Sequence, residues 1–272
     1  MEFLCPVRGC RQPLPREGRT FVCARGHSFD VARSGYVNLS QPQDKKSKNP
    51  GDSAEAVLSR RRLNDTGLGE GLAKVIVETG RRVVSNAVPA ILDIGCGEGF
   101  FLAGLSMAIG GEGLGVDLST AAVELAAKRY PAMTWVVANA DRQLPFANGS
   151  FDLVLSITAR HHPAEFHRLL AGRGCLIVVI PGADDLIELR EWIMGEGSER
   201  DRTETIRANY HPHFELLSSE SYRERRSLDR ASLLDLLIST YRGGRKSQEG
   251  MVASLSDLQV TMSREILVFK PR

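Results

Sequence analysis

The most informative stretch of this 272-residue chain runs Ala90-Ile91-Leu92-Asp93-Ile94-Gly95-Cys96-Gly97-Glu98-Gly99, or AILDIGCGEG. Its first half is a short apolar run, which predicts a buried strand. Its second half places glycine at every other position, so that the backbone can turn sharply and approach a ligand at the carboxyl end of that strand. A strand that ends in such a loop predicts a doubly wound α/β domain with a ligand site at the edge of its sheet.

Outward from this stretch, short apolar segments alternate with helix-like ones, a pattern typical of a parallel sheet covered by helices on both faces. Further strands are expected at residues 114–117, 134–137, 152–156 and 175–180, and a final strand pair at 214–228 and 260–269. Helices are expected from a cap at Ser119 to Arg129, over residues 184–194, and over residues 231–241 after a cap at Ser227 or Asp229. The sequence therefore predicts a mostly parallel sheet of seven strands.

Carboxylates follow the first three strands. Asp117 ends the second strand, 24 residues after Asp93, and in this position a carboxylate accepts hydrogen bonds from both ribose hydroxyls of a nucleotide. Asp141 follows the third strand, where it is placed to accept from an adenine amino group. The glycine spacing GxGxG differs from the GxGxxG of dinucleotide-binding domains, which makes NAD the weaker alternative. We therefore predict a class I S-adenosylmethionine-dependent methyltransferase, whose cofactor-binding residues are Asp93, Gly95, Gly97, Gly99, Phe100, Asp117 and Asp141.

The exit of the fourth strand usually carries the chemistry in this fold, and here residues 156–163 read SITARHHP. They lack the Asn or Asp, two prolines and aromatic residue that methyltransferases of base amino groups commonly carry. Methylation of a pyrimidine carbon needs a thiolate nucleophile, and Cys175 opens a buried strand. Ring nitrogens and hydroxyl oxygens remain as acceptors. Arg160 and His161 either orient the substrate and accept a proton, or lie at the surface and cap the next helix.

The first part of the chain carries a metal-binding pattern, C-x4-C-x12-C-x3-H, formed by Cys5, Cys10, Cys23 and His27. Zn²⁺ prefers four such ligands in a tetrahedron, and a reducing compartment favours metal binding over disulfides. Turn residues and the short apolar segment 20–22 predict a hairpin between the two ligand pairs, and one more short strand after His27 is expected to close the module. Four ligands leave no open position, so the zinc is structural.

Charge is unevenly distributed along the chain. Residues 1–62 hold 12 Lys+Arg and 6 Asp+Glu, whereas the remaining residues hold 23 and 27. A basic front end suits docking to a polyanion, although such an imbalance is also ordinary for a solvated surface. The segment with Lys45, Lys46 and Lys48 is either a linker or a phosphate-contacting arm. The basic stretch at 241–246 is likewise a loop or a phosphate contact.

No apolar run approaches the roughly 20 residues of a membrane span, and the start of the chain is unlike a signal peptide. A cytoplasmic protein without a membrane partner is therefore expected.

Together these motifs resemble the RlmA-type family of 23S rRNA (guanine-N1)-methyltransferases, nearly from end to end. The distinctive parts are the zinc motif, residues 35–39 (GYVNL), residues 51–55 (GDSAE) and Arg60-Arg61. The resemblance implies that the zinc module recognises a 23S rRNA hairpin. It also implies methylation of a guanosine at N1, an effect on macrolide-type antibiotics and antibiotic resistance in some members. From the placement of the residues we hypothesise that the base is splayed into a pocket at the exit of the fourth strand, that Arg160 orients it, and that His161 or a carboxylate such as Asp52 takes its proton.

Three positions depart from the family. The first cysteine pair is spaced by four residues instead of two, Gly69 replaces a tyrosine that helps to enclose the cofactor, and Asp185 replaces a histidine after the fifth strand. We predict a zinc-binding RNA-recognition module at 1–40, a linker and basic helix at 41–70, and a methyltransferase domain at 71–272. Two alternatives stay open: a methyltransferase of a small metabolite with zinc as a structural clip, and a non-catalytic RNA-binding protein. The oligomeric state is also open, with a homodimer as one option.

Overall fold

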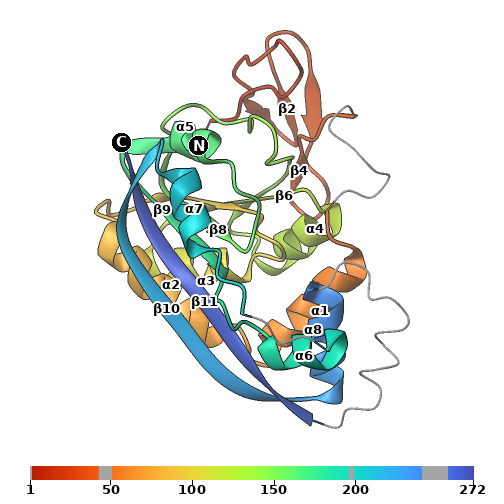
Figure 1. Cartoon of the computed structure of the whole chain (residues 1–272). Helices are drawn as coiled ribbons and strands as arrows, with labels where there is room; N and C mark the ends of the chain where they lie inside the picture. Colours follow the sequence, from red (N-terminus) through yellow and green to blue (C-terminus); the bar gives the residue numbers. More distant parts are fainter. Residues whose placement is uncertain (1, 43–50, 196–198, 241–256) are drawn as a thin grey trace.

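The computed structural model describes residues 2–42, 51–195, 199–240 and 257–272. Seven strands of the described chain form the body of one sheet: β5 (Ala90–Ile94), β6 (Glu112–Asp117), β7 (Thr134–Val137), β8 (Phe151–Ile157), β9 (Leu170–Pro181), β10 (Phe214–Asp229) and β11 (Asp257–Pro271). Their order is β10-β11-β9-β8-β5-β6-β7 (Figure 1). Pairing is parallel from β7 to β9, and β11 runs antiparallel to both β9 and β10. The predicted fold class is confirmed.

Helices cover both faces of this sheet. On one face lie α2 (Glu70–Val83), α3 (Phe100–Ile109) and α4 (Thr120–Arg129), whose buried side chains share one apolar cluster with the strands. The opposite face is covered by α5 (Pro163–Leu169), α7 (Thr203–Tyr210) and the metal-binding module. The predicted cap of α4 is confirmed, because the Ser119 side chain accepts a hydrogen bond from the Ala122 N–H. None of the described helices is long and apolar enough to cross a membrane.

The N-terminal module is a small antiparallel sheet of β1 (Arg16–Glu17), β2 (Thr20–Val22) and β3 (Ser28–Asp30). The expected hairpin is confirmed by the pairing of β1 with β2. The short strand expected after His27 is β3, which pairs antiparallel with β2 and closes the module as predicted. The next strand, β4 (Val37–Asn38), leaves the module: it pairs in parallel with β7 and adds an eighth strand to the central sheet. Two residues make few ladder bonds, and β4 stays in place because Val37 and Leu39 are buried in the core under the central sheet.

The module also shares side-chain packing with the domain built around the central sheet. Phe3 forms an antiparallel bridge with Phe146, with ring centroids 5.6 Å apart. The Leu4 N–H donates to the Pro145 carbonyl at 2.8 Å, and Arg11 donates to the Leu144 carbonyl at 3.0 Å. The metal-binding module therefore has a core continuous with that of the sheet.

A third apolar cluster lies under the long antiparallel pair of β10 and β11, where this pair projects beyond β9. It joins α1 (Ala54–Asp65), α6 (Ile187–Met194) and α8 (Arg230–Thr240) to these two strands (Figure 1). Helix α8 lies between β10 and β11 as predicted, with the Asp229 side chain accepting from the Ser232 N–H at 2.9 Å.

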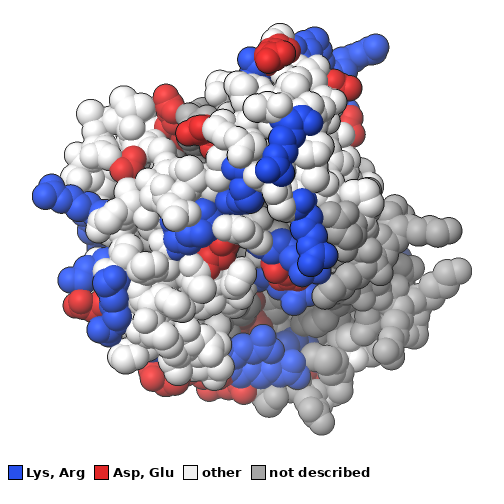
Figure 2. All heavy atoms as spheres, turned by 90° about the horizontal axis from the view of Figure 1, so that it is seen from above, with Lys and Arg blue, Asp and Glu red and all other residues white. Residues whose placement is uncertain are grey.

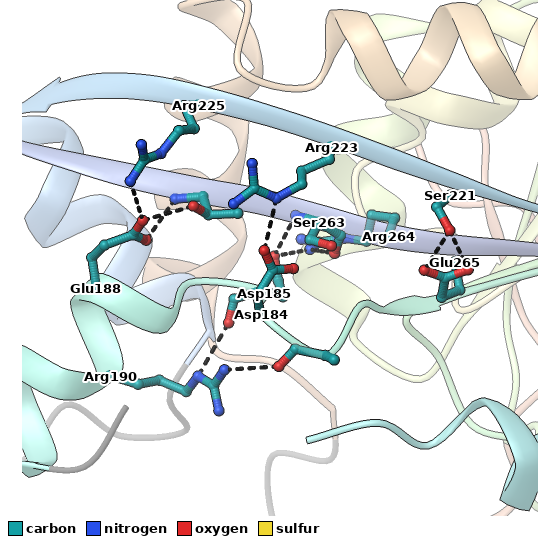
Figure 3. Close-up of polar contacts among 12 residues, drawn as sticks. Asp184, Asp185, Glu188, Arg190, Ser221, Arg223, Arg225, Ser263, Arg264 and Glu265 are labelled. Carbon is teal, nitrogen blue, oxygen red and sulfur yellow. Dashed lines mark hydrogen bonds and ion pairs between the residues drawn. The ribbon is translucent and has the colours of Figure 1, made fainter. Parts of the chain in front are cut away.

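Helix α6 begins later than predicted. It starts at Ile187 rather than at residue 184, because Leu186 adopts a left-handed conformation with φ of 52°. The two preceding acids turn toward β10 and β11 instead, where Asp184 pairs with Arg223 and Asp185 pairs with Arg264 (Figure 3). Tertiary ion pairing thus outweighs the local helical pattern.

Candidate cofactor site and metal site

The glycine loop turns between β5 and α3 as the sequence predicts. Gly95 has a φ of +79°, and a Cβ atom there would lie 2.6 Å from the Cβ of Ala159, so the position requires glycine. The N–H groups of Gly95 and Cys96 donate to the Val116 carbonyl at 2.8 and 3.0 Å. These contacts hold the loop between β6 and the exit of β8, at the carboxyl edge of the sheet.

Asp93 is a buried acid on β5. The residue is 2% exposed, and its Oδ1 accepts no hydrogen bond from the described residues. Burial, assisted by the charge of Asp117, raises the pKa of Asp93 to about 8. A buried carboxyl oxygen without a donor is costly, and a ligand that brings an ammonium or hydroxyl group would satisfy it. The α-ammonium of S-adenosylmethionine fits this requirement.

Asp117 lies beside the glycine loop. Its Oδ2 accepts from the Gly97 N–H at 2.9 Å, and its Oδ1 accepts from the Ser119 N–H at 2.8 Å. Burial raises the pKa of Asp117, and these two bonds oppose the rise. Because each carboxylate oxygen has a second lone pair, the group can also accept the two ribose hydroxyls predicted for it.

Asp141 follows β7 and is exposed. Its backbone N–H donates to the Asn139 side chain at 2.9 Å, and its carboxylate lies 4.0 Å from Nε of Arg160. The structure therefore brings the predicted adenine-binding acid next to the predicted substrate-orienting arginine.

Residues 51–55 lie directly on the turn between β6 and α4. Gly51 has a φ of +85°, and a Cβ atom there would lie 2.6 Å from the Ser119 nitrogen, so only glycine fits. The Ser119 hydroxyl donates to the Asp52 carbonyl at 2.8 Å, and the Ser53 side chain caps α1 by accepting from the Ala56 N–H. The segment thereby lays the start of α1 beside Asp117. The Asp52 carboxylate is engaged by Arg60 at 2.8 Å.

Helix α1 also brings residues that the sequence analysis missed. Asn64 donates to the buried Glu98 of the glycine loop at 2.9 Å. Nη1 of Arg60 reaches within 3.4 Å of the place where a Cβ of Gly97 would lie. The adjacent basic residues 60–62 were a visible signal, but the sequence did not show which of them faces the loop.

Phe100, the first residue of α3, lies under Gly69. A Cβ atom at Gly69 would lie 2.9 Å from the Phe100 ring and 2.6 Å from the Asn64 side chain. These two side chains leave no room for a larger residue at position 69. Whether Phe100 contacts the cofactor stays a prediction.

The exit of β8 is strained. Thr158 has a φ of 50°, a left-handed conformation that a β-branched residue rarely adopts, and its N–H donates to the Val179 carbonyl at 2.8 Å. Such strain is found at functional sites more often than elsewhere. The turn directs Ala159 onto the glycine loop and leaves Arg160 exposed.

His161 does not cap the next helix. Its Nδ1 lies 2.9 Å from the Tyr210 hydroxyl, whereas His162 is the residue before α5. Burial lowers the pKa of His161, so the imidazole is neutral at pH 7. A neutral imidazole can accept a proton.

Neither cysteine of the catalytic domain is suited to act as a nucleophile. Cys96 and Cys175 are buried, and burial raises the pKa of both thiols. This agrees with the exclusion of carbon methylation, because that reaction requires a thiolate.

The four predicted zinc ligands converge. All their ligand atoms lie within 4.8 Å of one another, and the three cysteines are buried and free of disulfides. Nδ1 of His27 lies 3.3 Å from Cys5 Sγ and 3.4 Å from Cys23 Sγ, and the sulfurs of Cys10 and Cys23 are 3.8 Å apart. Tetrahedral zinc with bonds of about 2.3 Å to sulfur places two sulfurs about 3.8 Å apart. The donor set therefore fits a structural zinc ion.

The sheet order, the glycine loop and the acids at its edge define a class I S-adenosylmethionine-dependent methyltransferase with a zinc-binding N-terminal module. In agreement, a methyltransferase domain model matches residues 91–175, and a model described as RlmA, N-terminal, matches residues 3–48. The fold is shared with a chain in the solved structure of a complex between the Haloferax volcanii Trm112 methyltransferase activator and a methyltransferase. The TM-score is 0.53, and the identity is 17%, over 80% of this chain and 97% of that one.

Two relatives narrow the class further. This chain is 32% identical to a 23S rRNA (guanine(748)-N(1))-methyltransferase of Streptomyces fradiae, over 98% of this chain and 96% of the relative. It is 37% identical to a Bacillus subtilis protein named as a 23S rRNA (guanine-N1)-methyltransferase, over 75% of this chain and 72% of that protein. The chain belongs to the family of 23S rRNA (guanine-N1)-methyltransferases.

Proposed function

We propose that this enzyme methylates N1 of a guanosine in a hairpin of 23S rRNA, in the cytoplasm, and thereby alters the binding of macrolide-type antibiotics to the ribosome. The observation that carries the proposal is the end-to-end match to a relative with this activity in its name, zinc module included. A methyltransferase of small metabolites has no evident use for that module, and nothing in the structure favours such a substrate.

The surface of the module supports an RNA partner. Five of its arginines are exposed, and none pairs with a carboxylate among the described residues: Arg8, Arg16, Arg19, Arg25 and Arg33. Figure 2, which views the molecule from the module side, shows basic side chains gathered in a band across this face, with fewer acidic ones among them. Arginines whose charge is not offset by a carboxylate can neutralise phosphates and make binding sensitive to salt. The predicted arm with Lys45, Lys46 and Lys48 and the basic stretch 241–246 lie outside the described residues.

The methyl transfer forms one bond, breaks one bond and releases one proton. Guanine N1 forms a bond to the methyl carbon, the carbon–sulfur bond breaks, and the N1 proton leaves to a base. S-adenosylmethionine would supply the methyl group on a sulfonium, from which the sulfur leaves as a neutral thioether. The protein gains most by holding N1 in line behind the methyl carbon, which is worth up to about 7–11 kcal/mol.

In this proposal Arg160 orients the splayed base and His161 takes the N1 proton. His161 is neutral at pH 7, and when its Nδ1 donates to the Tyr210 hydroxyl, Nε2 is free to accept a proton. Asp52 is the second candidate for the base, although its carboxylate is engaged by Arg60. Asp141 lies 4.0 Å from Arg160 and can fix the direction of its guanidinium.

Two experiments test the proposal. Modified guanosines are mapped on 23S rRNA from cells with and without the gene, and a methylated N1 that depends on the gene is expected. Single-turnover rates on the cognate hairpin are then measured for Arg160→Ala, His161→Ala and Asp52→Asn, with His211→Ala as the control because His211 is an exposed histidine outside the site. Identical maps from both strains contradict the target, and unchanged rates contradict the residue roles.

A further inference from the structure

The three consecutive arginines of α1 have different partners. Arg62 donates from Nε to the Asp235 carboxylate of α8 at 2.8 Å, and Arg61 lies 3.7 Å from Asp65, one turn further along the helix. Arg60 alone of the three is directed at the glycine loop, since its Nη1 lies 3.4 Å from the position of a Cβ on Gly97. The sequence motif therefore contains one residue of the cofactor edge and two that serve the packing of the helix.

The guanidinium of Arg60 is held along one side and open on the other. Nη2 donates to the Asp52 carboxylate at 2.8 Å and to the Ser239 carbonyl at 3.1 Å. Within the described residues, Nη1 and Nε have no hydrogen-bond acceptor, although the side chain is only 35% exposed. An arginine fixed in this way presents two unused donors in a set direction, which is the arrangement that binds a carboxylate well.

The acidic groups around the glycine loop also favour a positive charge above Gly97, where Arg60 lies. Asp93 and Asp117 put two carboxyl groups at the edge of the sheet, and they suit the ammonium and the ribose of the cofactor. The α-carboxylate of the same amino-acid moiety would be repelled by Asp117, and by Asp93 once the ammonium has ionised it. A positive charge above Gly97 offsets this repulsion, and it also favours the ionised form of Asp117, whose pKa it lowers.

We propose that Arg60 binds the α-carboxylate of S-adenosylmethionine, with Asp52 and the Ser239 carbonyl holding its guanidinium in place. Arg60 thereby selects the cofactor with an intact amino-acid end, and α1 acts as one wall of the site. The inference depends on the methyltransferase class and is independent of the RNA target proposed above.

The test compares two ligands that differ only in this group. Affinities for S-adenosylmethionine and for its decarboxylated form, which keeps the amine and the sulfonium, are measured by calorimetry on the zinc-loaded full chain without RNA. The wild type should bind S-adenosylmethionine about ten- to a hundredfold more tightly, as expected for a hydrogen-bonded charged group. Arg60→Met should abolish this preference and leave the affinity for the decarboxylated form nearly unchanged.

Arg61→Met is the matched control. It removes an arginine side chain from the next position of α1, and it should keep the preference for S-adenosylmethionine over the decarboxylated form. Arg60→Lys retains the positive charge but not the paired donors of a guanidinium, so this variant should keep part of the preference for S-adenosylmethionine. The same variant replaces Arg60→Met in the test if Arg60→Met fails to fold. The proposal is overturned if Arg60→Met weakens the binding of both ligands by the same factor. Equal affinities of the wild type for the two ligands would also overturn it, and this outcome is measured without any variant.

Discussion

Asn64 of α1 donates from Nδ2 to Oε1 of Glu98 at 2.9 Å, and this bond ties the helix to the glycine loop. Glu98 is 2% exposed, and its other carboxylate oxygen lies 3.7 Å from Nη1 of Arg129 on α4. A carboxylate buried this deeply depends on each donor it has. The loop is thus fixed from two helices, one of which packs on the distant α8.

Asn64→Leu should lower the free energy of unfolding by about 1–3 kcal/mol, because Glu98 loses its hydrogen-bond donor while it stays buried. Urea denaturation with a linear extrapolation measures the change. In a Glu98→Met background, where no acceptor is present, the same substitution should cost markedly less. Equal costs in the two backgrounds would show that the bond contributes nothing.

Asp93 should make stability depend on pH. Its pKa is raised from 3.8 to about 8 in the folded chain, so between these values the folded state holds a proton that the unfolded state has lost. Stability therefore falls as the pH rises from about 4 to about 8 and levels off above that range. Asp93→Asn lacks this proton, and the variant should gain stability relative to the wild type across the window. Urea denaturation at four pH values checks this, and a difference that stays constant with pH would refute it.

The same group should couple cofactor binding to proton release. An ammonium group placed against Asp93 favours the ionised carboxylate, so binding of S-adenosylmethionine at pH 7 should release protons from this residue. Calorimetry in two buffers with different ionisation enthalpies counts them. Asp93→Asn is the control for protons lost by the ligand itself, and an equal release from both proteins would show that Asp93 stays protonated in the complex.

Local pattern was enough for most of the fold. The parallel strands are predictable because each is an apolar run ended by a loop, and Ser119 marks its helix by capping it. The pattern fails where long-range contacts decide. Val37–Asn38 follows the zinc module closely in the sequence, yet Val37 pairs with Val136 of the distant strand β7. The start of α6 is displaced because the two acids before it pair with β10 and β11.

The residues of the site also divide into those that local sequence predicts and those that depend on long-range packing. Asp93, Asp117 and the glycines follow from a contiguous motif and from strand ends that must meet at one edge. Arg60 and Asn64 were missed because their positions depend on how α1 packs against α8, which follows more than 160 residues later. A helix with three adjacent basic residues shows its charge in the sequence, whereas the direction of each side chain is set by tertiary packing.

Loss of zinc should destabilise the whole chain in one transition, because the module and the catalytic domain share a core. Phe3 packs on Phe146, and the buried metal ligands belong to the same apolar cluster as the sheet. Scanning calorimetry of Cys10→Ser, or of protein treated with a chelator, should show a single melting transition at a lower temperature. Cys96→Ser, which leaves the zinc ligands intact, should keep the response to the chelator. A separate early transition with an unchanged main one would mean that the module melts alone.

Two adjacent acids before α6 offer a matched comparison of a buried and an exposed ion pair (Figure 3). Asp185 pairs with Arg264 and accepts from the Ser263 N–H at 3.0 Å, and the two paired side chains are only 10% and 14% exposed. Asp184 pairs with Arg223, whose side chain is 54% exposed. Removing one partner of a buried pair leaves a charge without compensation and costs about 3–5 kcal/mol, whereas an exposed pair contributes about 1 kcal/mol or less.

Asp185→Asn should therefore destabilise the chain several times more than Asp184→Asn in urea denaturation at low salt. Raising the salt should reduce only the smaller effect, because exposed charges are screened and buried ones are not. If both variants lose the same stability, the Asp185–Arg264 pair is no more than a surface contact.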